Sequence, residues 1–105
     1  MPFIDVEYEG ELHCSITHEL SGSVIATDAP PDNQGKGETF SPTDLLAASL
    51  ASCIATVLGI YAQRKQWDLR GMRLRIEKKM SQNPPRRVEA LLTEVWMPIS
   101  FNSEE

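Results

Sequence analysis

The chain has 105 residues, of which 41% are apolar and 24% charged, so it is long enough for one small globular domain and not for two. The net charge of −5 argues against nucleic acid as a partner, because a nucleic-acid-binding surface needs a basic patch. The N-terminus lacks the features of a secretion signal, and no stretch approaches the roughly 20 apolar residues that span a bilayer, so we expect a cytoplasmic protein without a membrane partner.

The first quarter of the sequence predicts an antiparallel meander of short strands. Apolar and polar residues alternate over residues 3–8 and again over 12–17, and Glu9-Gly10-Glu11 between them is typical of a turn. A second turn at residues 20–23 leads to a third short strand over residues 24–27. Residues 28–36 are rich in Pro, Asp, Asn and Gly, and this composition predicts a loop.

The clearest local pattern predicts a helix over roughly residues 42–65. Ser41 is a good N-cap, Pro42 suits the first helical position, and Asp44 stands where a capping box places its acid. The basic pair Arg64-Lys65 suits the negative end of the helix dipole. Hydroxyl residues interrupt the apolar run, which favours the core helix of a globular protein.

Two strands are predicted after this helix. Met72, Leu74 and Ile76 alternate with polar residues, as in a half-buried strand that continues to Met80. A turn with two prolines follows, and a less regular apolar pattern over residues 88–97 predicts a strand that pairs back and ends at Pro98. We assign the basic residues around the first of these strands to a solvated face, in preference to a binding patch: Arg70, Arg73, Arg75, Lys78 and Lys79.

Strands, one helix and more strands make an α+β fold, in which an antiparallel sheet packs on a central helix. A single helix leaves much of a sheet of about five strands uncovered. Ser103-Glu104-Glu105 resembles the N-cap and first turn of a further helix. Either such a helix or a partner chain is expected to supply the missing cover.

The segment from Gly37 to Cys53 has the pattern Gly-x-x-Phe-Ser-Pro-x-x-Leu-Leu-x-Ala-x-x-x-Ser-Cys and closely resembles the OsmC/Ohr family, the osmotically inducible and organic-hydroperoxide-resistance proteins. Tyr8-Glu9-Gly10, Trp67 to Gly71 and Met97-Pro98 resemble other parts of the family pattern. The resemblance implies an intertwined α+β homodimer. Residues 1–105 would then be a single OsmC-like domain, the N-terminal two-thirds of the family fold.

The resemblance also implies chemistry at Cys53. In the best-known members a cysteine on the central helix attacks an organic hydroperoxide, and a second cysteine on a later helix resolves the sulfenic acid. An Arg near the N-terminus and a Glu just after the helix-start Pro assist in the hydroperoxide-resistance branch. Here the residue after that Pro is Thr43, and no Arg precedes Arg64, so the chain resembles the broader OsmC-like group. The implied partners are a small organic hydroperoxide and a thiol reductant.

Cys53 is thus the candidate catalytic residue, with Glu38 and Thr43 as candidate supporting residues. The alternative is a non-catalytic, dimeric binding or structural module in which Cys53 only packs, because no basic residue lies within one helical turn to stabilise its thiolate. Thr56 joins Cys53 and two serines, Ser49 and Ser52, in a small-residue stripe that suits close packing against another helix.

The remaining thiol and imidazole groups are predicted to be structural. Cys14 shares a strand face with apolar residues and is expected in the core, and a role in resolving Cys53 is the less favoured alternative. His13 and His18 are expected at the solvated surface. Two cysteines are too few for a disulfide framework, and no Cys/His cluster has metal-ligand spacing, so we expect neither a metal nor another cofactor.

Overall fold

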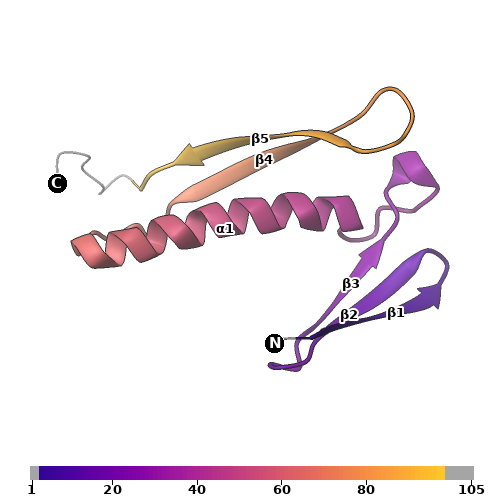
Figure 1. Ribbon diagram of the computed structural model, residues 1–105, viewed down its shortest axis with the longest axis horizontal. Coiled ribbons are helices and arrows are strands. Elements are labelled where there is room, and N and C mark those ends of the chain that lie inside the picture. The colour runs from indigo at the N-terminus through magenta and orange to yellow at the C-terminus, as the bar shows by residue number, and fades with distance from the viewer. Residues whose placement is uncertain (1–2, 99–105) are drawn as a thin grey trace. The chain divides into compact units, whose positions relative to one another are not determined.

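The computed structural model describes residues 3–98, with one long helix and five strands in an α+β arrangement (Figure 1). Its contacts divide the chain into two compact units, Met1–Leu45 and Leu46–Glu105, and each is described by itself. The further helix predicted at Ser103-Glu104-Glu105 lies outside the described residues.

The first unit contains the predicted meander. Strands β1 (Ile4–Gly10), β2 (His13–His18) and β3 (Val24–Asp28) form an antiparallel sheet in the order β1-β2-β3. The first turn falls one residue later than predicted, because β1 runs to Gly10 and both Glu11 and Leu12 take the left-handed conformation, with φ of 54° and 64°. The registry places apolar side chains together on one face of this sheet: Ile4, Val6, Tyr8, Cys14, Ile16 and Ile25.

The predicted loop connects this sheet to the helix. Its one regular element is the 3₁₀ turn η1 (Pro31–Asn33). Gly35 is needed here, because a Cβ at this position would overlap the backbone carbonyl of Ala29. The loop therefore folds closely back on the end of β3.

Helix α1 (Pro42–Lys65) has the predicted bounds and begins with a complete capping box. The backbone N–H of Asp44 donates to Ser41 Oγ at 3.0 Å, and the backbone N–H of Ser41 donates to Asp44 Oδ2 at 3.0 Å. Ser41 is buried. Each of the two side chains thus accepts a hydrogen bond from the backbone N–H of the other residue, and these N–H groups would otherwise be unpaired at the helix start.

The end of α1 is a Schellman motif. Gln66 takes the left-handed conformation with φ of 60°, the N–H of Trp67 donates to the carbonyl of Ala62 at 2.9 Å, and the N–H of Gln66 donates to that of Gln63 at 3.2 Å. The Trp67 ring meets Tyr61 edge-on, with ring centroids 5.7 Å apart. This ring contact accompanies the motif, in which Gln66 takes the left-handed position that glycine usually occupies at a helix end.

Most of α1 is exposed along its length. Ala47 and Ala62 are the only buried apolar residues among residues 3–98. By length and composition alone α1 could cross a membrane, so the expectation that no segment reaches that length was wrong. The core helix of a soluble protein can have the same length and apolar composition, however. The exposed apolar side chains of α1 then need to be buried against another protein surface.

In the second unit, β4 (Arg73–Met80) and β5 (Val88–Trp96) form an antiparallel pair. Half-buried and exposed residues alternate along β4 as predicted, and Arg73, Arg75 and Lys79 lie on its exposed positions. The guanidinium of Arg73 lies over the Trp96 ring, 5.4 Å from its centroid. The five strands therefore belong to two sheets, where the sequence had suggested one sheet of about five.

Candidate functional site

Cys53 lies in the middle of α1, and its side chain is exposed in the single chain. The other members of the small-residue stripe, Ser49, Ser52 and Thr56, are exposed as well. The hydroxyl of Ser49 donates to the Leu46 carbonyl at 2.7 Å, and that of Ser52 donates to the Ser49 carbonyl at 3.2 Å. Because these hydroxyls bond back to the helix, the stripe presents a narrow surface on which the thiol is the most reactive group.

Cys14 is half-buried on β2, in the first unit, and both thiols are free. In the sheet it lies opposite Tyr8 on β1 and Thr27 on β3. The sequence placed Cys14 on an inward strand face, and the sheet puts it among the apolar side chains of one face. The structure does not test the less favoured alternative, in which Cys14 resolves Cys53.

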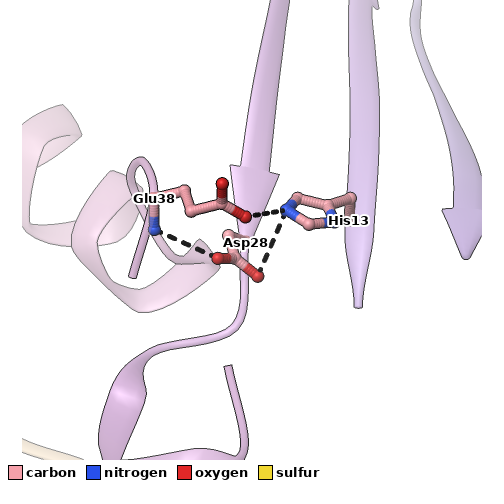
Figure 2. Close-up of side chains that lie close together, drawn as sticks. All are labelled: His13, Asp28 and Glu38. Carbon is pink, nitrogen blue, oxygen red and sulfur yellow. Dashed lines mark hydrogen bonds and ion pairs between the residues drawn. The ribbon is translucent and has the colours of Figure 1, made fainter. Parts of the chain in front are cut away.

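The first unit brings three ionisable side chains together where β2, β3 and the loop meet (Figure 2). His13 Nε2 lies 3.3 Å from Glu38 Oε1 and 3.5 Å from Asp28 Oδ1. His13 begins β2 and lies directly opposite Asp28, the last residue of β3. The loop then returns Glu38 to the same point, so residues far apart in sequence form one cluster.

Asp28 is the fixed centre of this cluster, because its side chain is only 1% exposed. The backbone N–H of Glu38 donates to Asp28 Oδ2 at 3.1 Å, and the backbone N–H of Asp28 donates to the Phe40 carbonyl at 3.0 Å. The hydrogen bond from the Glu38 amide lowers the pKa of Asp28; burial opposes this change, and the nearby His13 ring lowers the pKa further. The carboxylate is therefore ionised at neutral pH.

Glu38 and Thr43, the candidate supporting residues, take different places. Glu38 faces His13 and Asp28, whereas the Thr43 hydroxyl lies 3.2 Å from that of Ser41 in the helix cap. Cys53 lies farther along α1, in the second unit. Glu38 and Thr43 therefore each contact residues of the first unit, to which both belong.

The two histidines also differ. His18, at the end of β2, is half-buried and so is not at the solvated surface as predicted, and its Nδ1 lies 2.6 Å from Ser21 Oγ. His13, with 27% of its side chain exposed, is half-buried beside two carboxylates, so the prediction of a solvated surface role was wrong for it. The missed signal was strand registry: pairing the start of β2 with the end of β3 places His13 opposite Asp28.

Comparison with known proteins places these features in a family. The family model described as OsmC-like protein matches residues 35–105, which include α1, β4 and β5. The chain belongs to the OsmC-like family. No protein of curated function matches the sequence.

A solved structure supports the same assignment over nearly all of this OsmC-like chain. A crystal structure from Psychrobacter arcticus, of a protein named for the osmotic stress and detoxification response, is 43% identical with a TM-score of 0.90. The match covers 99% of this chain and 75% of that chain. The OsmC-like fold predicted from the helix motif is confirmed.

Proposed function

We propose that this OsmC-like protein serves in stress defence by reducing organic hydroperoxides at Cys53. The observation that carries the proposal is the exposed thiol of Cys53 at the cysteine position of the family's helix motif. The name of the Psychrobacter arcticus relative, which refers to stress and detoxification, is consistent with this role. A thiol that meets peroxide must be accessible, and the position of Cys53 on α1 meets that requirement.

The proposed reaction begins with the thiolate, which is the nucleophilic form of cysteine. The Cys53 sulfur attacks the distal peroxide oxygen, the S–O bond forms as the O–O bond breaks, and the alkoxide leaves with a proton as an alcohol. The thiol is oxidised to sulfenic acid while the hydroperoxide is reduced. An external dithiol then restores Cys53: its first thiol releases water and forms a mixed disulfide, and its second displaces Cys53 as a thiol.

The stripe around Cys53 supports a second candidate, a non-catalytic module. Small side chains with hydroxyls bonded back to the helix allow another helix to approach closely. In that case Cys53 would pack against a second copy of the chain as a small apolar group. The two functions differ in one measurable property, which is turnover of peroxide.

Turnover is tested by following loss of cumene hydroperoxide with dithiothreitol as the dithiol. We expect the wild-type protein to consume peroxide catalytically and Cys53→Ser to fall to the rate without protein. Cys14→Ser is the matched control, because it removes the other thiol and should keep most of the activity. If wild type and Cys53→Ser consume peroxide at the same rate, the non-catalytic module is the correct function.

A further inference from the structure

We propose that His13, Asp28 and Glu38 form a binding site for a divalent transition-metal ion, with Zn²⁺ as the best match. The three side chains offer one imidazole nitrogen and two carboxylate oxygens, and these atoms all lie within 4.8 Å of one another. They come from β2, β3 and the returning loop, as Figure 2 shows. The three ligands all belong to the first unit, whereas Cys53 belongs to the second.

Two of the three separations between the ligand atoms match those around a metal ion, and all three atoms lie within 4.8 Å of one another. Bonds of about 2.0–2.1 Å to a tetrahedral Zn²⁺ put neighbouring ligand atoms about 3.3 Å apart. The separations from His13 Nε2 are 3.3 Å to Glu38 Oε1 and 3.5 Å to Asp28 Oδ1. A charge-assisted hydrogen bond would be shorter, at about 2.7–2.9 Å.

The number of partners points the same way. His13 Nε2 carries at most one proton, and this proton can be directed at only one of the two carboxylate oxygens that the nitrogen faces. A cation among the three atoms would instead bond to the nitrogen and to both oxygens. Without a cation, one N–H faces two acceptors and can satisfy only one of them. With a cation, all three atoms are ligands of the same ion.

Asp28 supplies an independent reason to expect a cation. Its Oδ1 is buried and has no hydrogen-bond partner among the described residues, although Oδ2 accepts the Glu38 amide. A buried acceptor without a partner is costly, and an ionised one more so. Oδ1 is the atom directed at His13, so a metal ion there would satisfy it (Figure 2). The Glu38 amide would meanwhile hold the carboxylate in place, as outer partners do in metal sites.

The donor types select the ion. Imidazole nitrogen suits Zn²⁺ and other late divalent metals, while carboxylate oxygen also accepts Mn²⁺, and the absence of thiolate among these three ligands disfavours Cu⁺. Glu38 is 59% exposed, so the ion would be reached from solvent and would keep a position for water. Three protein ligands and a water form the usual open zinc site.

The test is calorimetric titration of chelator-treated protein with Zn²⁺, in a Cys14→Ser, Cys53→Ser background so that thiols do not contribute. We expect one ion per chain, and binding weakened about tenfold or more by Glu38→Gln and by His13→Asn. His18→Asn is the matched control, because it alters the half-buried histidine at the other end of β2, outside the cluster, and should bind as the parent does. X-ray absorption of the zinc-loaded parent should show only N and O ligands at about 2.0 Å.

Two results would overturn the proposal. One is no stoichiometric binding of either Zn²⁺ or Mn²⁺ by the parent protein. The other is equal affinity in the parent, Glu38→Gln and His13→Asn proteins. Glu38→Gln changes a largely exposed side chain, so it reports on binding even where the His13 variant is less stable.

Discussion

At the residue scale, the reactivity of Cys53 depends on what stabilises its thiolate. No Arg, Lys or His lies within one helical turn of it in the sequence, and its place in the middle of α1 is too far from the helix start for the dipole to help much. We therefore expect the activating charge to come from elsewhere in the fold or from a second copy of the chain. In the proposed function Cys53 is a necessary group that does not make the site by itself.

A titration at Asp68 tests the electrostatics of the turn before β4. Arg70 donates side-chain and backbone hydrogen bonds to this carboxylate and lowers the pKa of Asp68 from 3.8 to about 2. A depressed folded pKa means that the interaction is fully present above about pH 3.8 and is lost as the pH falls toward 2. Carbon-detected NMR should give an Asp68 midpoint near 2. Arg70→Ala should return the midpoint toward 3.8, and an unchanged midpoint would contradict this assignment.

At the element scale, the sequence predicted what is encoded locally. The bounds of α1 follow from Ser41, Pro42 and Asp44 at its start, and the β4 alternation follows from its apolar spacing. The division into two sheets and the cluster around Asp28 were missed, because both depend on pairing between distant residues. His13, Asp28 and Glu38 show no spacing that a local pattern could reveal.

The capping box gives a stability prediction for α1. Ser41→Ala removes the acceptor of the Asp44 amide and should lower the free energy of unfolding by about 1 kcal/mol. Ser52→Ala is the matched control, because the Ser52 hydroxyl only bonds back to the helix and alanine is a better helix former. Denaturant melts measure both changes. Equal stability of Ser41→Ala and wild type would mean that this cap does not hold the helix start.

At the scale of the whole molecule, the described residues expose more apolar surface than a stable single chain should. Large apolar side chains with at least half their area exposed occur on β1 and α1, among them Val6, Tyr8, Leu46 and Val57. Exposed large apolar side chains in such number on one element mark an interaction site. We expect a second copy of the chain to cover it, as the family resemblance implies.

Light scattering tests this assembly. The wild-type protein should be a homodimer at micromolar concentration, because stable interfaces bury about 1,200–2,000 Å² and the exposed apolar side chains suit such an interface. Val57→Asp places a charge on the exposed apolar surface of α1 and should shift the protein toward monomer. Gln63→Asp, at an exposed polar position of the same helix, should leave the dimer intact. A monomeric wild-type protein would remove the need for a second copy.

The central claim is that Cys53 is a peroxide-reactive thiol, and intact-protein mass spectrometry tests it most directly. Folded protein is treated with a slight excess of cumene hydroperoxide in the absence of reductant, and the modified residue is located by peptide mapping. We predict a gain of one oxygen atom at Cys53, trapped as sulfenic acid, with Cys14 unmodified and no gain in Cys53→Ser. A Cys53 that stays reduced in folded protein under excess peroxide would contradict the account and leave the thiol a packing group.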